Sequence, residues 1–158
     1  MKGVTKITLS DHVTLITINS FNSSSVYLKL LKMVSDAGIN VDMISQTPPL
    51  GGKLGFSFTI SDADLMQALT ILGSFKMQDQ GICCEISSGN SKLSFYGEEM
   101  RDCAGVASEV FLIFSETGVQ AKLITTSTVD ISVLIDRHSI ADVLNKIREK
   151  TAIEVSFS

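Results

Sequence analysis

Hydrophobic residues change their spacing several times along the chain, and each change predicts a new element. Over residues 12–19 apolar and polar positions alternate, which is typical of a half-buried strand. From Val26 to Val34 the apolar positions recur at helical spacing until Gly38, which predicts a helix that ends at a glycine. The same two periods then predict strands over 40–46, 54–60 and 81–87, and a helix over 62–75 capped by Ser61 or Asp62. The segment TPPLGGKLG, with both prolines and three glycines, is typical of a hairpin loop between two of these strands.

The chain repeats this pattern at an offset of 80 residues. Ile16 lies over Tyr96, Gly38 over Gly118 and Ile44 over Ile124, and the match needs no gap in this part of the chain. Two copies of one unit are therefore present. The second copy predicts strands over 92–98, 119–126, 129–135 and 152–157, and helices over 103–116 and 139–150.

A βαββαβ order with two amphipathic helices predicts the ferredoxin-like plan. The fold class is then α+β, with two such units, each an antiparallel sheet with both helices on one face. The strand VTKITL, residues 4–9, precedes the first copy, and we expect it to pair in the sheet of the second. The expected domains are residues 10–88, and residues 1–9 together with 89–158, so that the first unit is inserted in the second.

Composition limits the function classes that need attention. The chain is 44% hydrophobic and 19% charged, which is enough apolar material for a core, and no apolar run approaches the roughly 18 residues that span a bilayer. The net charge of −4, with no cluster of Lys and Arg, argues against a nucleic-acid partner. The odd number of cysteines, with Cys83 next to Cys84, fits a reducing compartment, and we expect a cytoplasmic protein without a membrane partner.

The sequence contains no recognisable catalytic or metal-binding motif. His12 and His138 stand at the starts of predicted elements, where a histidine is usually solvated or capping. Glu98 and Glu99 fall at the end of a predicted strand, where adjacent side chains point to opposite faces and cannot share a proton. We therefore expect no active site and no metal site.

Polar residues do collect at the first strand-to-helix junction, residues 19–26, and on one face of the strand 40–46. Helix capping and a solvated sheet surface would each explain them. The other interpretation is a pocket for a free amino acid, in which junction N–H groups bind the carboxylate, and Asp42 with amide oxygens binds the ammonium. This interpretation takes the strands 12–19 and 40–46 to be neighbours.

Three stretches resemble one family. They are DAGINVDMISQ (36–46), GEEMRDCAGVASEVF (97–111) and STVDISVLID (127–136), and they closely resemble the paired ACT domains of the regulatory C-terminal half of aspartate kinases. The resemblance covers nearly the whole chain, including its first strand. It implies ACT–ACT pairing into a homodimer, and feedback inhibition of the kinase catalytic domain when threonine or lysine binds at ACT–ACT interfaces.

The resemblance also implies which residues contact the effector. They are Asn22, Ser24, Ser25, Val26, Tyr27, Asn40, Val41, Asp42 and Gln46 of the first unit, and Met100, Ser127 and Thr128 of the second, whose junction includes Asp102 and Gly105. Where the family has an Asp-x-Pro-Gly turn, the first unit has Asn22-Ser23-Ser24-Ser25, and Thr128 replaces a glutamate. The loss of two carboxylates favours threonine over lysine as the ligand.

The kinase half of that family is not within these 158 residues, so the resemblance implies no catalytic activity and no cofactor for this chain alone. ATP and Mg would belong to the missing kinase domain. We expect a regulatory piece of the kinase or a separate regulatory subunit. Two alternatives are a structural dimerisation module without a ligand, and a free-standing sensor that acts on another partner.

Overall fold

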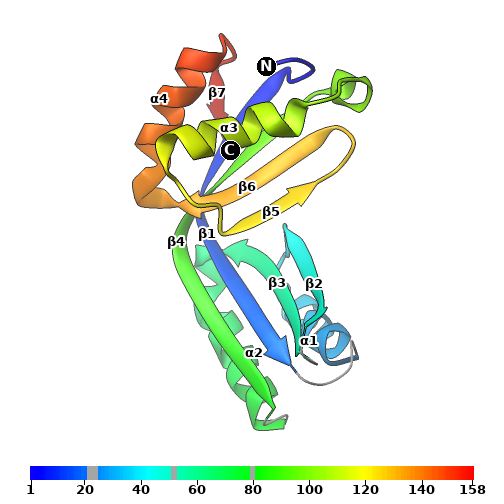
Figure 1. Cartoon of the computed structure of the whole chain (residues 1–158). Helices are drawn as coiled ribbons and strands as arrows, with labels where there is room; N and C mark the ends of the chain where they lie inside the picture. The colour runs from blue at the N-terminus through cyan, green and yellow to red at the C-terminus, as the bar shows by residue number, and fades with distance from the viewer. Residues whose placement is uncertain (21–24, 51–52, 79–80) are drawn as a thin grey trace. The chain divides into compact units, whose positions relative to one another are not determined.

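Two strands of fifteen residues, β1 and β4, take part in both units of the chain. The structure is a computed structural model that describes residues 1–20, 25–50, 53–78 and 81–158 (Figure 1). Contacts divide the chain into a first unit, residues 12–88, and a second unit, residues 1–11 with 89–158. The strands are β1 (Lys6–Ser20), β2 (Ile44–Leu50), β3 (Lys53–Ser61), β4 (Ile82–Tyr96), β5 (Leu123–Thr126), β6 (Asp130–Asp136) and β7 (Val155–Phe157), and the helices are α1 (Ser25–Asp36), α2 (Leu65–Gln78), α3 (Val106–Thr117) and α4 (Ile140–Lys150).

The first unit has the strand order β2-β3-β1-β4. β3 runs antiparallel to both β1 and β2, and Ile16 lies opposite Phe58. These two side chains share one core with Leu30 of α1 and Leu72 of α2, so both helices cover the same face of the sheet. This is the ferredoxin-like arrangement, and it confirms the predicted fold class.

The second unit repeats the arrangement with the order β1-β4-β6-β5. β6 runs antiparallel to β4 and to β5. Leu93 and Val133 of this sheet pack with Val110 of α3 and Val143 of α4 in a second core. β1 enters the sheet next to β4, where the Thr5 N–H donates to the carbonyl of Tyr96 at 2.8 Å.

The last strand of the chain differs from its expected place. We expected residues 152–157 to close the βαββαβ order of the second unit, but β1 occupies that position beside β4. β7 lies outside β1 and pairs with it in parallel, with Ile7 opposite Val155. Ile7 and Leu9 are almost fully buried, whereas Val155 is half-buried and Phe157 exposed, so the more apolar strand takes the inner position.

The strand expected over 40–46 begins only at Ile44. Just before it, the Asp42 N–H donates to the Thr59 carbonyl at 3.1 Å, while the Thr59 N–H donates to the Met43 carbonyl at 3.0 Å. Two residues therefore oppose one, which is a bulge. The expected polar face is still present, because Asn40, Asp42 and Gln46 are exposed while Met43 is buried.

The hairpin loop expected over 47–55 is also too long. β2 continues through both prolines to Leu50, and its register shifts between Thr47 and Leu50. β2 is the edge strand of the first unit, and a proline is tolerated there because an edge residue needs no N–H toward a second neighbour. The sequence pattern could not show which strand is at the edge.

Two breaks that were expected between strands are absent from the structure. The strands expected over 4–9 and 12–19 form one strand, β1, and those over 81–87 and 92–98 form one strand, β4. His12 in β1 and Gly89 in β4 have positive φ, at 60° and 69°, where the chain passes from one unit to the other. Glu98 and Glu99 begin a 3₁₀ turn rather than ending a strand.

Helix ends follow the glycines and capping residues of the sequence. Gly118 closes α3 in the left-handed conformation, with φ of 68°, and Gly38 has φ of 77° just after α1. Ser61 accepts a hydrogen bond from the Ala63 N–H at 3.2 Å and so caps the turn that leads into α2. Within the described ranges, every helix is too short or too polar to cross a bilayer.

Candidate functional site

A pocket of about 320 Å³ lies in the second unit, between the start of α3 and the turn that joins β5 to β6. Every residue around it belongs to the second unit. The lining residues are Met100, Arg101, Cys103, Gly105, Val106, Ala107, Thr126, Ser127, Thr128 and Ile131.

The start of α3 offers backbone donors to this pocket. Gly105 precedes the helix with φ of 93°, a left-handed conformation that glycine adopts readily, and it has no side chain that could cap the helix. The first N–H groups of a helix have no partner within the helix, and its dipole favours a negative charge at that end. Gly105, Val106 and Ala107 all line the pocket, so the site suits a carboxylate.

The opposite wall is a tight turn rich in hydroxyl groups. The Ser127 N–H donates to the Asp130 carbonyl at 2.8 Å, and the Val129 N–H donates to the Ser127 hydroxyl oxygen at 3.2 Å. Thr126 and Thr128 flank Ser127 on this wall, and both are exposed. The turn therefore offers hydroxyl groups to a small polar ligand.

The charge of the pocket comes from one side chain. Arg101 lines it and also donates to the carboxylate and the backbone carbonyl of Glu98, the latter at 3.1 Å. No Asp or Glu is among the lining residues of this described pocket. Met100 and Ile131, both buried, supply its apolar side. The arrangement suits an anionic or zwitterionic ligand with a small side chain.

The structure brings together the three effector positions predicted in the second unit. Met100, Ser127 and Thr128 all line the pocket, and so does Gly105. Asp102 is exposed and is not among the lining residues. Sequence reasoning missed several further lining residues, which are Arg101, Cys103, Val106, Ala107, Thr126 and Ile131.

The internal repeat contains a signal for some of the missed residues. At the offset of 80, Gly105, Val106, Ala107 and Thr126 correspond to the first-unit positions Ser25, Val26, Tyr27 and Gln46. All four of those first-unit positions were predicted to contact the effector. Mapping them back onto the second copy would have indicated most of the start of α3.

The first-unit positions near α1 are only partly described. Asn22 and Ser24 lie outside the described residues, and Ser25 is the first residue of α1. Val26 is half-buried against the core of the first unit. Their arrangement as a binding wall stays a prediction.

Tyr27 belongs to the core of the first unit. Its side chain is 3% exposed, its hydroxyl donates to the Leu54 carbonyl at 2.6 Å, and its ring stacks on Phe56 with 4.8 Å between ring centroids. Burial raises the pKa of this hydroxyl above its usual value. The corresponding pocket residue in the second unit is only an alanine, Ala107.

The remaining predicted positions surround β2. Val41 packs against the core, while Asn40, Asp42 and Gln46 are exposed. The assumption that this strand is the neighbour of strand 12–19 is wrong, because β3 lies between β2 and β1. In the ferredoxin-like order the first and second strands are never adjacent.

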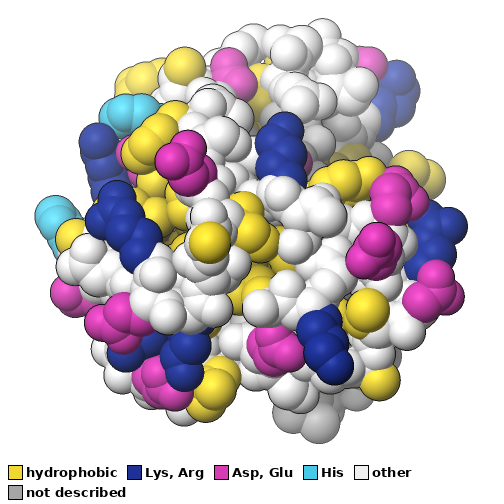
Figure 2. All heavy atoms as spheres, turned by 90° about the horizontal axis from the view of Figure 1, so that it is seen from above, with side chains coloured by type: hydrophobic (Ala, Val, Ile, Leu, Met, Phe, Trp, Pro, Cys, Tyr) yellow, Lys and Arg dark blue, Asp and Glu magenta, His cyan; other side chains and the backbone are white. Residues whose placement is uncertain are grey.

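The cysteines and the surface charges offer less chemistry. Cys83, Cys84 and Cys103 are all free thiols, and burial raises the pKa of Cys84. On the face in Figure 2, basic and acidic side chains are interspersed around exposed apolar ones. Within the described residues, no three potential metal ligands lie close enough together to hold an ion.

Comparison with known proteins agrees with this architecture. Residues 93–150 match the ACT domain family. The chain is 27% identical over 151 residues to Aspartokinase 2 of Bacillus subtilis, which covers 95% of this chain and 36% of that protein. It is 28% identical over 147 residues to an aspartokinase of Geobacillus stearothermophilus, covering 90% of this chain and 34% of that protein. The chain thus spans about a third of the length of these curated relatives.

Two solved structures are similar over nearly their whole chains. The aspartokinase alpha and beta subunits have a chain that is 30% identical, with a TM-score of 0.83, covering 93% of this chain and 97% of that one. The ligand-free regulatory subunit of aspartate kinase from Thermus thermophilus is 25% identical, with a TM-score of 0.84, covering 94% of this chain and 99% of that one. Because its repeated fold and its sequence both match these proteins, the chain belongs to the family of ACT-domain regulatory regions of aspartokinases.

Proposed function

We propose that this chain senses a free amino acid, threonine in preference to lysine, and through it gives feedback control of an aspartokinase. An allosteric regulatory role follows from its family. The identity of the effector is the new part of the proposal. The observation that supports it is the pocket at the start of α3, where backbone donors and a hydroxyl-rich turn face one small space.

Threonine suits this pocket better than lysine does. The carboxylate of either amino acid would accept from the N–H groups at the start of α3. The second ammonium of lysine would need an acidic partner, but Arg101 is the only charged side chain of the described lining. A threonine hydroxyl and methyl group would instead meet Ser127 or Thr128 and the apolar side of the pocket.

Pairing of ACT units is the second part of the proposal. β2 is at the edge of the first unit and β5 at the edge of the second, and each exposes an isoleucine, Ile44 at 48% and Ile124 at 39%. The repeat places these two residues at equivalent positions. The adjoining first helices expose Leu28 and Leu112. Apolar edge surfaces of this kind favour pairing with another ACT unit in a homodimer.

The kinase partner follows from the relatives. The chain matches about a third of their length, so the catalytic part of an aspartokinase would lie outside these 158 residues. An effector bound here would act by stabilising one arrangement of the regulatory units that the catalytic part also senses.

The test is thermal unfolding of the 158-residue chain with threonine, lysine, methionine or isoleucine. At about 100 times its dissociation constant, a ligand that binds only the folded state adds about 2.7 kcal/mol of stability. We expect threonine to raise the melting temperature most. A shift with lysine alone would contradict the assignment of threonine, and no shift with any of the four would contradict amino-acid binding and favour a structural module.

A variant locates the site. Ala107→Tyr places in the second unit the residue that the first unit has at the same position, so it should fill the pocket and abolish the threonine shift. Ala141→Tyr is the matched control, because Ala141 is also exposed and is also the second residue of a helix in the same unit. If both variants kept the threonine shift, the ligand would bind elsewhere.

A further inference from the structure

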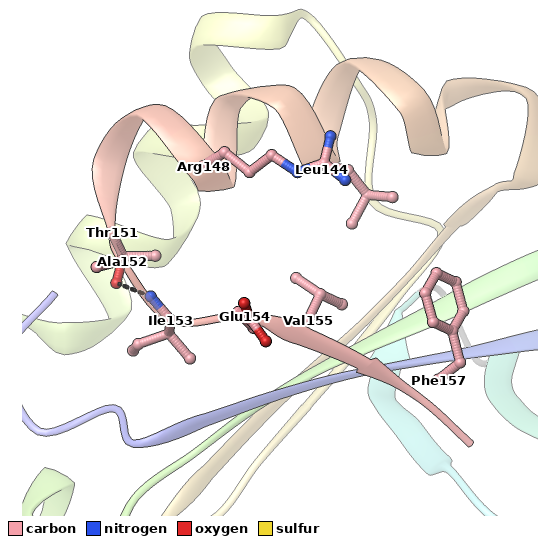
Figure 3. Close-up of a pocket in the computed structure, with 8 residues that line it drawn as sticks. All are labelled: Leu144, Arg148, Thr151, Ala152, Ile153, Glu154, Val155 and Phe157. Atoms are coloured by element: carbon pink, nitrogen blue, oxygen red, sulfur yellow. Dashed lines mark hydrogen bonds between the residues drawn. The ribbon is translucent and has the colours of Figure 1, made fainter.

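A groove of about 460 Å³ lies in the second unit, between α4 and the segment that ends in β7. Figure 3 shows Leu144 and Arg148 on the helix side, and Val155 and Phe157 on the strand side. Val155 and Phe157 extend from β7 toward the helix, so the groove has an apolar floor. The proposed effector pocket shares no lining residue with it.

The strand that borders this groove has an open edge. In the described part of the chain, β7 pairs with β1 alone. The Ser158 N–H donates to the Leu9 carbonyl at 3.0 Å, so the backbone groups of residue 158 point toward β1. Backbone groups alternate sides along a strand, and those of Val155 and Phe157 therefore point outward. They are available to a further strand.

Phe157 is unusually exposed for its residue type. Its side chain is 74% exposed, whereas the five phenylalanines of the two cores are at most 5% exposed and Phe111 is half-buried. Phe157 lies opposite Leu9, and hence on the face of the sheet that α4 covers. An aromatic ring in this place, beside an open edge and an apolar groove, is typical of an interface.

From these features we infer that the open edge of β7 binds β7 of a second copy of this chain in antiparallel pairing. A two-fold axis at Ser156 would place Val155 of each copy opposite Phe157 of the other. Both residues have outward N–H and C=O groups, so each pair of Val155 with Phe157 of the other copy forms two hydrogen bonds, and the interface forms four. The same symmetry brings each Phe157 ring beside Val155 and Leu144 of the other copy.

The charges around the groove agree with a second copy as the occupant. The chain has a net charge of −4, so two copies repel each other over most of their surfaces. The groove is lined by one cationic side chain, Arg148, and one anionic side chain, Glu154, so its net charge is zero. Two such grooves therefore do not repel each other. An isologous contact of this kind is self-complementary by construction.

The size of the contact predicts a weak dimer. Each phenylalanine buries about 150–250 Å². Two rings and the groove surfaces that they cover stay below the roughly 1,200 Å² of a standard interface. We therefore expect a reversible dimer through β7, separate from the pairing of β2 and β5 edges proposed above.

Disulfide trapping tests the register. Ser156 would lie opposite Ser156 of the other copy in a non-hydrogen-bonded pair, with Cα atoms about 4.5 Å apart, which a disulfide can bridge. Ser156→Cys should form a covalent dimer under mild oxidation. Ser158→Cys should form none above the background of the unaltered chain with its three native cysteines, because residue 158 would lie opposite residue 154. Equal trapping of both variants, or of neither, would overturn the inference.

Sedimentation of the full chain tests the contact itself. Ile44→Lys together with Ile124→Lys removes the β2 and β5 edges from the measurement, and a weak dimer should remain. A second substitution, either Phe157→Pro or Phe157→Lys, is then added to this variant. Phe157→Pro removes only an outward N–H and the ring, and each substitution should weaken the dimer at least tenfold. Circular dichroism shows whether each variant remains folded. An unchanged association constant in the variant that remains folded would show that β7 is not the contact.

Discussion

Substitution of Tyr27 tests whether this residue serves the core or contacts the effector. The other tyrosine of the chain, Tyr96, is a matched control, because each of the two hydroxyl groups donates one hydrogen bond of 2.6 Å. Tyr27 is 3% exposed and bonds the Leu54 carbonyl, whereas Tyr96 is 37% exposed and bonds the Glu98 carboxylate. Tyr27→Phe removes one buried hydrogen bond and keeps the ring stack on Phe56. The expected loss is about 1 kcal/mol of unfolding free energy.

The matched change, Tyr96→Phe, should cost less than about 0.5 kcal/mol, since water replaces an exposed hydrogen bond. Urea unfolding followed by circular dichroism measures both. With a slope of about 2 kcal/mol per molar, Tyr27→Phe moves the midpoint down by about 0.5 M. Tyr27→Ala, which also loses the ring, should cost about 3–5 kcal/mol.

Ligand binding completes the comparison. If Tyr27 serves only the core, Tyr27→Phe leaves the threonine shift of the melting temperature unchanged. The reasoning is refuted if Tyr27→Phe and Tyr96→Phe have the same midpoint, or if Tyr27→Phe removes the threonine shift from a protein of undiminished stability.

Three further predictions concern packing, pH and backbone contact. Leu30→Ala, at a fully buried position of α1, should lower the unfolding free energy by about 2.7–5 kcal/mol, and Leu28→Ala, at a position 71% exposed, by less than about 0.5 kcal/mol in urea titration of the monomer. The pKa of the Asp136 carboxyl is lowered by the hydrogen bond from the His138 backbone N–H and by Lys122. The ionised carboxylate therefore stabilises the fold above pH 3.8, and this stabilisation is lost as the pH falls below that value. In an acid titration, Asp136→Asn should lose stability less steeply than the parent protein. Gly97→Ala would place a Cβ 1.8 Å from the carbonyl oxygen of Gly3, so we expect a lower melting temperature. An unchanged melting temperature would mean that the N-terminal segment, which contains Gly3, moves away freely.

The helices and the fold class were predictable because their signals are local. Gly38 and Gly118 mark the ends of equivalent helices, and the apolar spacing between them and the preceding strands repeats at one offset. Register and edge position are not local. The sequence around Pro48 does not show that its strand lies at the edge of the sheet, where prolines are tolerated. The bulge opposite Thr59 depends on two backbone hydrogen bonds between segments that are distant in the sequence.

The candidate site was predictable only in part for a related reason. Met100, Ser127 and Thr128 came from the family resemblance, and the structure places them around one pocket. Arg101 was missed because no pattern distinguishes a residue that lines a cavity from any other exposed residue, whereas Ala107 could have been found through its equivalence to Tyr27 in the repeat. The polar set around Asp42 was assigned to the wrong neighbour, since strand order was assumed rather than derived from the βαββαβ plan.

The division of the chain between its units has a consequence for the order of folding. The first unit is one continuous segment, residues 12–88, and it can fold as soon as that segment has been synthesised. The second unit must wait, because its sheet pairs Ile7 with Val155, residues that are 148 positions apart (155 − 7). Non-local pairing of this kind is slow, and until the second unit has folded, the apolar side chains of Ile7 and Leu9 lack the core that buries them. Nascent second units, rather than first units, are therefore the species that should need chaperone protection.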